Sequence, residues 1–267
     1  MPIAPPRRLH RERLRIIDGL PVSYARAGRH WAPWRERLVL VHGSGCSADS
    51  WRYQLDGLSR DFDVLALDLP GHGSSEPVGD PSIQRYATTV RGILRHLGKR
   101  KVFLAGHSMG GAVALQVALE HPELLKGLIL VAATAYLDTL ALTPNIILWA
   151  AATVPHKFKG MFFSDRVTPE ALAVARADVR RCSLETVMGD FAACRHFDFR
   201  GRLKGLKLPA LILCGTEDRI TPPRHSQRLQ EEISESSLMR IAKAGHMLPL
   251  EAPKEVNAAI REFIRRV

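Results

Sequence analysis

Short apolar runs and amphipathic segments alternate along most of the chain. Apolar runs bounded by Gly, Asp or Pro are typical of buried strands, and they are expected within 37–43, 63–73, 101–108, 125–133, 208–218 and 238–246. Segments with apolar residues at helical spacing follow them, at 48–59, 82–97, 108–121, 222–233 and 253–267. This alternation of strand and helix predicts an α/β fold built on a parallel sheet.

The first strands follow a different pattern. Residues 14–28, "LRIIDGLPVSYARAG", predict an antiparallel hairpin that turns at Asp18-Gly19. The later strands are almost continuously apolar, as expected for strands that helices cover on both faces. The sequence therefore predicts a mostly parallel, doubly wound sheet of about eight strands, with the hairpin at one edge.

Residues 134–196 interrupt this alternation. Their pattern is mostly helical, and they contain the apolar run "NIILWAAATV" at 145–154. A helical insertion between two strands of a sheet predicts a cap that lies over one end of the sheet. The expected organisation is a core in two parts, 1–133 and 197–267, with a helical cap or lid at 134–196 inserted between them.

Composition narrows the class of protein. The chain has 267 residues, of which 46% are hydrophobic, as in a globular domain. Its apolar runs fall short of the roughly 18 to 20 residues that cross a membrane, and its basic N-terminus lacks the apolar stretch of a secretion signal. We therefore expect no integral membrane segment, and a cytoplasmic location is the default expectation.

Charge and cysteine content add two further expectations. The net charge is +11, but the basic residues are scattered and accompany no nucleic-acid-binding motif, so we expect a solvated basic surface and no nucleic-acid partner. The four cysteines lack the spacing of a metal site, which favours reduced thiols and no bound metal. A disulfide between Cys182 and Cys194 stays open at this stage.

One serine stands in a setting that favours catalysis. In "KVFLAGHSMGGAVAL" (101–115) a buried strand enters a G-x-S-x-G turn and a helix leaves it. This arrangement is typical of a nucleophile elbow, in which Gly106 and Gly110 let strand and helix pass closely while the serine hydroxyl is exposed at the sheet edge. Ser108 is therefore the candidate nucleophile.

A serine hydroxyl needs a base, which is usually a histidine oriented by a carboxylate. In the fold that carries this elbow, the acid and then the histidine follow later strands of the sheet. His246 lies after the last predicted strand and is the candidate base. Asp218 follows the preceding strand, with Glu217 beside it and Asp138 after an earlier strand as alternative acids.

Attack on a carbonyl creates an oxyanion, which two preorganised N–H groups must stabilise. Met109, the residue after the nucleophile, is expected to supply one of them. The loop "HGSGCS" (42–47) is expected to supply the other, from Ser44 or, as the alternative, from Gly45.

These residues belong to sequence blocks that resemble the α/β-hydrolase family over nearly the whole chain. The blocks are "LVHGSG" (40–45), "DLPGHGSS" (68–75), "GHSMGG" (106–111), "GTEDRITP" (215–222) and "AGHMLPLE" (244–251). The resemblance implies a catalytic triad of Ser108, Asp218 and His246, and the family's G-x-x-D spacing from Gly215 favours Asp218 over Glu217. It also implies oxyanion donors at Ser44 and Met109, a cap at 134–196 and no cofactor.

The identity of the nucleophile narrows the function that the resemblance implies. Similar families with a cap, such as haloalkane dehalogenases and epoxide hydrolases, need Asp at the elbow, whereas "GHSMGG" resembles carboxylesterases and monoacylglycerol lipases. We therefore expect a serine carboxylesterase (EC 3.1.1-type) for small-molecule esters of small to medium acyl chains, monomeric or homodimeric. Three alternatives stay open: a C–C bond or lactone hydrolase with the same triad, an acyltransferase or perhydrolase, and a ligand receptor without turnover.

Overall fold

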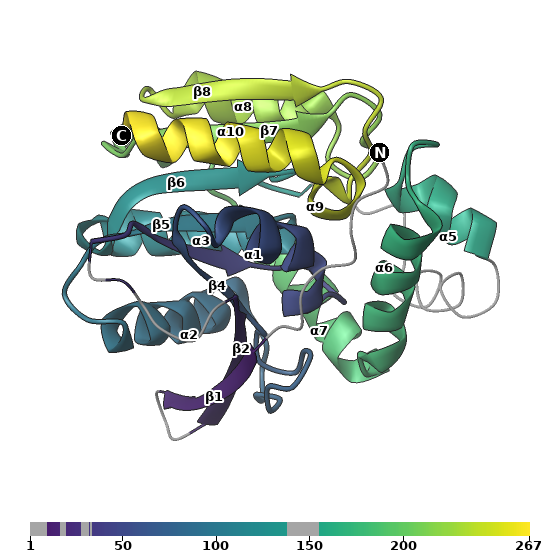
Figure 1. The fold of residues 1–267 in the computed structure, drawn as a ribbon, viewed down its shortest axis with the longest axis horizontal. Coiled ribbons are helices and arrows are strands. Elements are labelled where there is room, and N and C mark those ends of the chain that lie inside the picture. Colours follow the sequence, from purple (N-terminus) through teal and green to yellow (C-terminus); the bar gives the residue numbers. More distant parts are fainter. Residues whose placement is uncertain (1–9, 17–19, 28–31, 33, 138–154) are drawn as a thin grey trace.

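The computed structural model describes residues 10–16, 20–27, 32, 34–137 and 155–267. Its centre is an eight-stranded sheet with the order β1-β2-β4-β3-β5-β6-β7-β8 (Figure 1). The strands are β1 (His10–Ile16), β2 (Leu20–Arg26), β3 (Arg37–Val41), β4 (Asp63–Leu67), β5 (Val102–His107), β6 (Leu125–Val131), β7 (Ala210–Gly215) and β8 (Ser236–Ile241). The predicted fold class is confirmed.

The two antiparallel pairings lie at one edge of the sheet. Strand β1 pairs with β2 as a hairpin in which Ile16 lies opposite Leu20, and β2 pairs antiparallel with β4. From β4 onward every pairing is parallel. Because parallel neighbours end at the same edge, the loops that follow β3, β5, β7 and β8 meet at one end of the molecule.

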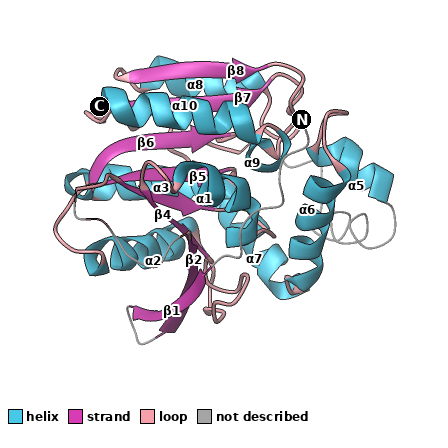
Figure 2. Cartoon of the chain, viewed as in Figure 1, coloured by secondary structure: helices cyan, strands magenta, loops and turns pink. Residues whose placement is uncertain are grey.

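Helices cover both faces of the sheet, as Figure 2 shows. They are α1 (Arg52–Leu58), α2 (Ile83–His96), α3 (Met109–Glu120), α8 (Pro223–Glu232), α9 (Leu248–Glu251) and α10 (Pro253–Arg266). Alternate residues of β3 face opposite sides of the sheet and therefore belong to different core layers. Val39 and Val41 pack in the layer that contains α2 and α3 side chains, and Leu38 packs in the layer that contains those of α1 and α10. This alternation confirms the doubly wound arrangement.

The helix predicted at 48–59 is divided into a 3₁₀ turn, η1 (Ala48–Trp51), and α1. The Ser47 hydroxyl accepts a hydrogen bond from the N–H of Asp49, and the Asp68 carboxylate accepts one from the N–H of Ala48. Both acceptors lie outside the turn, and they bind two N–H groups that have no acceptor within it. Two further 3₁₀ turns, η2 (Pro122–Leu124) and η3 (Leu203–Gly205), connect other elements.

Three helices of the inserted segment lie beside the carboxyl ends of the strands (Figure 1). They are α5 (Pro155–Phe162), α6 (Pro169–Arg181) and α7 (Leu184–His196). Thr168 and Ser183 cap the N-termini of α6 and α7 by accepting backbone N–H groups. The apolar run at 145–154 and Asp138 lie outside the described residues, and the limits of the cap as a domain stay a prediction.

These three helices, called the cap helices after the predicted cap, pack onto the core through a third apolar cluster. Val179 and Phe191 of these helices and Phe163, which follows α5, share this cluster with Cys46 and Met247 from the core loops. All four cysteines are free thiols, so Cys182 and Cys194 do not form a disulfide. Among the described residues, no helix is long and apolar enough to cross a membrane.

Candidate active site

The turn between β5 and α3 holds Ser108 in a strained backbone conformation. Its φ is +53° and its ψ is −119°, a region that residues with a side chain rarely adopt. The Ser108 N–H donates to the carbonyl of Val131 at 3.0 Å. A Cβ atom on Gly106 would overlap the carbonyl of Gly110, and one on Gly110 would overlap the carbonyl of Val41. Both glycines are therefore required for the close approach that presents the serine.

Loops after three strands bring Ser108, His246 and Asp218 together. The Ser108 Oγ lies 2.9 Å from the Nε2 of His246, and the Nδ1 of His246 lies 2.9 Å from the Oδ2 of Asp218. Because a carboxylate only accepts hydrogen bonds, the Nδ1 carries the proton and the Nε2 lone pair faces the serine hydroxyl. The three residues that the sequence singled out thus form one continuous chain of hydrogen bonds.

Asp218 is buried, whereas its neighbour Glu217 is exposed. The Oδ1 of Asp218 accepts hydrogen bonds from the N–H groups of Ile220 and Thr221, at 2.8 and 2.9 Å. Burial by itself raises the pKa of Asp218, but the charge and hydrogen bond of His246 and the bonds from Thr221 offset this, so the pKa lies below its usual value. Asp218 is the carboxylate that faces the histidine.

Two other histidines near the site are engaged in local bonds. The Nε2 of His107 donates to the carbonyl of His246 at 2.9 Å, so it supports the loop of the candidate base. The Nε2 of His42 accepts the N–H of Leu69, and its Nδ1 faces the carbonyl of Gly43. Burial lowers the pKa of His107 and of His42 to about 3, so both stay neutral.

The loop after β3 turns tightly beside the elbow. The N–H of Cys46 donates to the carbonyl of Gly43 at 3.2 Å, and Gly45 has a φ of +64°. A Cβ atom on Gly43 would lie 3.1 Å from the Cβ of Ser108, so this backbone runs directly against the nucleophile. The N–H of Gly45, one of the two sequence candidates for the second oxyanion donor, donates instead to the Oδ2 of Asp190 at 3.3 Å.

An apolar cavity opens at Ser108, between the core loops and the cap. Phe162, Val187 and Phe191 of the cap line it together with Met109 and Met247. None of the described residues that line it is Asp, Glu, Lys or Arg. The Cys46 thiol also lines the cavity, and burial raises its pKa to about 12, so it stays protonated. Among the described residues no cluster of His, Cys, Asp or Glu is arranged to hold a metal ion.

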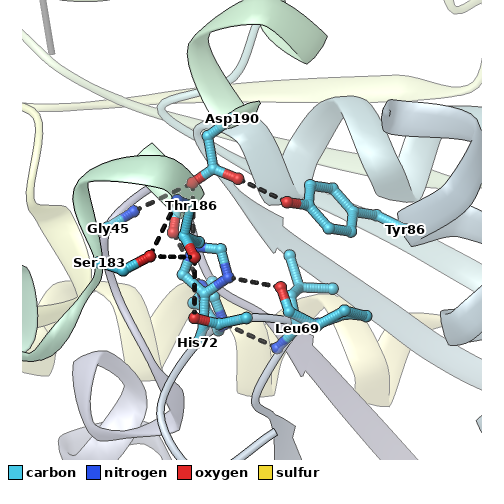
Figure 3. A network of polar contacts seen from close by, with 11 residues as sticks. Gly45, Leu69, His72, Tyr86, Ser183, Thr186 and Asp190 are labelled. Atoms are coloured by element: carbon cyan, nitrogen blue, oxygen red, sulfur yellow. Dashed lines mark hydrogen bonds and ion pairs between the residues drawn. The ribbon is translucent and has the colours of Figure 1, made fainter. Parts of the chain in front are cut away.

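A buried polar network behind the loop joins the cap to the core (Figure 3). Asp190 of α7 is fully buried and lies 2.9 Å from the Nε2 of His72, while it accepts the Tyr86 hydroxyl at 2.7 Å. The Nδ1 of His72 lies 3.0 Å from the carbonyl of Pro70, so both ring nitrogens face acceptors. Burial by itself would lower the pKa of His72, but the charge and hydrogen bond of Asp190 raise it well above its usual value.

Sequence reasoning did not single out Asp190, nor Asp178 and Glu251. Asp178 of α6 accepts the hydroxyl of Ser47, the last residue of the 42–47 loop, at 2.8 Å. Glu251 accepts the N–H of Ser164 at 2.7 Å and that of Gly245, which precedes the candidate base. An isolated carboxylate on a helix carries no local sequence signal when its partner is distant: Ser47 is 131 residues from Asp178, His72 is 118 from Asp190, and Ser164 is 87 from Glu251.

Comparison with known proteins agrees with this fold. A sequence profile described as "Alpha/beta hydrolase family" matches residues 38–259. The chain belongs to the α/β-hydrolase family. It is 32% identical to an uncharacterized hydrolase, YugF, of Bacillus subtilis, over 93% of this chain and 96% of that protein.

Two further likenesses bear on chemistry. The chain is 31% identical, over 86% of its length, to the dihydrolipoyllysine-residue acetyltransferase component of the acetoin cleaving system of Pseudomonas putida, and spans 63% of that protein. A thermophilic esterase of Thermogutta terrifontis has a similar structure, with a TM-score of 0.80 and 27% identity over 96% of this chain and 98% of that one. Together with the family match, the likenesses to the Bacillus hydrolase and to the esterase support hydrolytic activity.

Proposed function

We propose that this protein is a serine esterase that hydrolyses carboxylic esters with uncharged, apolar acyl groups. The observation that carries the proposal is the unbroken chain of hydrogen bonds from Ser108 through His246 to Asp218 at an apolar cavity. The strained elbow, the tautomer of His246 and the likeness to hydrolases support the same reading.

The proposed reaction uses these groups in two half-reactions. The Oγ of Ser108 attacks the ester carbonyl while its proton passes to the Nε2 of His246, and Asp218 stabilises the resulting imidazolium. The imidazolium then gives the proton to the departing alcohol, which leaves an ester between Ser108 and the acyl group. A water molecule, deprotonated by the same nitrogen, releases the carboxylic acid and restores the serine.

The developing oxyanion needs two donors, and we assign them to the N–H groups of Met109 and Ser44. Met109 is the first residue of α3, so its N–H has no carbonyl partner within the helix. Of the two candidates in the loop after β3, Gly45 directs its N–H to Asp190. Ser44 is therefore the donor that the geometry favours.

The cavity supports the choice of acyl group. Transfer of a charged group from water into an apolar site without a partner is strongly unfavourable, and the described lining offers no cationic side chain. We expect p-nitrophenyl esters of butanoate to octanoate to be hydrolysed, and the p-nitrophenyl monoester of succinate to be at least about tenfold poorer in kcat/KM than the butanoate ester.

The test is an ester panel run on the wild-type protein and on Ser108→Ala. Activity on the neutral esters that Ser108→Ala abolishes, with an unchanged circular dichroism spectrum, supports the proposal. Equal turnover by the two proteins refutes the role of Ser108. A preference for the succinate ester refutes the assignment of an apolar acyl group.

Acyl transfer is the second candidate, because one relative is named as an acetyltransferase component and the same acyl-enzyme could react with a nucleophile other than water. Product analysis in the presence of added alcohol separates the two reactions. At 0.1 M, methanol is roughly five-hundredfold less concentrated than water. We expect a hydrolase to give mainly free acid under these conditions, whereas a predominance of methyl ester identifies a transferase.

A further inference from the structure

The loop after β3 carries a β-turn whose central peptide has a defined orientation. The turn spans Gly43 to Cys46, with a hydrogen bond between its ends and a φ of +64° at its third residue, Gly45. A positive φ at the third residue alone is the mark of a type II turn. In a type I turn the peptide between Ser44 and Gly45 would be turned over, and the N–H of Gly45 would point to the opposite side.

The carboxylate of Asp190 accepts this N–H and is itself held from three sides. His72 and the N–H of Gly45 contact its Oδ2, at 2.9 and 3.3 Å, and the Tyr86 hydroxyl contacts its Oδ1 (Figure 3). Both nitrogens of His72 face acceptors, so the ring carries a positive charge and pairs with the carboxylate. Asp190 therefore presents a fixed negative charge to the Gly45 N–H.

The contacts around this pair tie α7 of the cap to the core. The Thr186 hydroxyl of α7 donates to the carbonyl of Gly71 at 3.4 Å, next to His72. Tyr86 belongs to α2, so Asp190 joins the cap, the β3 loop, the β4 loop and a core helix at one buried point. Among the described residues, this carboxylate bonds to Gly45, His72 and Tyr86 and to no member of the proposed triad.

We propose that Asp190 is a positioning residue for the oxyanion hole. By accepting the Gly45 N–H it selects the type II form of the turn and so keeps the backbone of Ser44, the proposed second donor, fixed against the elbow. The cap thus contributes to catalysis from behind the loop, besides covering the cavity. This inference rests on the proposed esterase function.

Three variants test it. Asp190→Asn weakens the acceptor and removes its charge. Tyr86→Phe is the matched control, because it removes a bond to the same carboxylate but leaves the Gly45 contact. Gly45→Ala disfavours the positive φ without changing any side chain of the network, and the nearest atom to its new Cβ, the Cγ2 of Val179, is at an ordinary contact distance of 3.6 Å.

The readouts are kcat and KM for p-nitrophenyl butanoate, the inhibition constant of butylboronic acid, and urea unfolding. Removing an oxyanion donor outright lowers kcat by about 10² to 10³, so misdirecting one is expected to lower it about 10- to 100-fold. We expect that loss of kcat in Asp190→Asn and in Gly45→Ala, with KM within about threefold of wild type. Butylboronic acid forms a tetrahedral adduct with the serine, so its binding is expected to weaken in parallel with kcat. Tyr86→Phe is expected to lose stability but keep kcat within about twofold.

The outcomes separate this inference from the proposed function. A folded Asp190→Asn protein whose kcat falls no more than that of Tyr86→Phe overturns the positioning role. If Asp190→Asn does not fold, Gly45→Ala decides, and a kcat at the wild-type level overturns the role. A wild-type protein that neither hydrolyses the ester nor binds the boronate refutes the proposed function, and the inference falls with it.

Discussion

Replacing Asp218 by Asn is expected to abolish most activity while leaving the fold in place. The side-chain oxygen at the Oδ1 position accepts two backbone N–H groups, from Ile220 and Thr221. An Asn at this position keeps its carbonyl oxygen on those donors, because turning the amide over would place its NH₂ group against them. The NH₂ group then faces the Nδ1 of His246, where Oδ2 of the carboxylate now lies at 2.9 Å.

An NH₂ group can only donate, so it forces the proton of His246 from Nδ1 to Nε2. The Nε2, 2.9 Å from the Ser108 Oγ, then has no lone pair with which to accept the serine proton. In a serine protease, a histidine held in the wrong tautomer lowers kcat by about 10⁴, which corresponds to about 5.5 kcal/mol of activation free energy. Because both backbone bonds survive, the loss in unfolding free energy is expected to stay near about 1–2 kcal/mol.

The assay is steady-state hydrolysis of p-nitrophenyl butanoate, with urea unfolding as the check on the fold. Glu217→Gln is the matched control, since it makes the same chemical change at the exposed neighbour and is expected to keep wild-type kcat. The reasoning is refuted if folded Asp218→Asn retains more than about a tenth of wild-type kcat, or if Glu217→Gln loses activity to the same extent.

Three further predictions concern the elbow, the cavity and the buried ion pair. Gly110→Ala forces a Cβ atom onto the Val41 carbonyl and is expected to lower the free energy of unfolding in urea by about 3 kcal/mol or more. Gly205→Ala is the control, because Gly205 has open space around it, and equal stability of the two proteins would contradict the packing argument. Val187→Phe fills the cavity and is expected to lower the octanoate-to-acetate ratio of kcat/KM at least about tenfold. Each methylene of the octanoate chain that can no longer be buried loses about 0.8 kcal/mol of binding free energy. Met188→Phe, on the exposed side of the same helix, should leave the ratio unchanged. The raised pKa of His72 means that its stabilisation is complete below about pH 6.5 and falls by about 1.4 kcal/mol per pH unit above it until the folded-state pKa is reached. The difference in unfolding free energy between wild type and His72→Gln should therefore shrink from pH 6.5 to 8, and a constant or growing difference would show that His72 is neutral in the fold.

The sheet could be predicted from the periodicity of apolar runs along the sequence. Ser108 could be predicted from the G-x-S-x-G turn between a strand and a helix, and His246 from its place after the last strand. The choice between Asp218 and Glu217 needed the family resemblance at the level of sequence, and the structure separates them by burial, because adjacent residues in a loop point in different directions.

The link between cap and oxyanion loop could not be predicted in the same way. Asp190 contacts His72 and Gly45 across separations of 118 and 145 residues, and no local pattern relates these positions. The sequence left Ser44 and Gly45 as competing donors for the same reason, since the direction of the Gly45 N–H depends on a carboxylate that arrives from a distant helix.

The central claim is that Ser108 is an activated nucleophile, and labelling with a fluorophosphonate probe followed by peptide mass spectrometry tests it most directly. We predict one adduct, on Ser108, in the folded wild-type protein, and strongly reduced labelling in His246→Ala. A folded wild-type protein that stays unlabelled, or that carries the adduct on another residue, would contradict the claim.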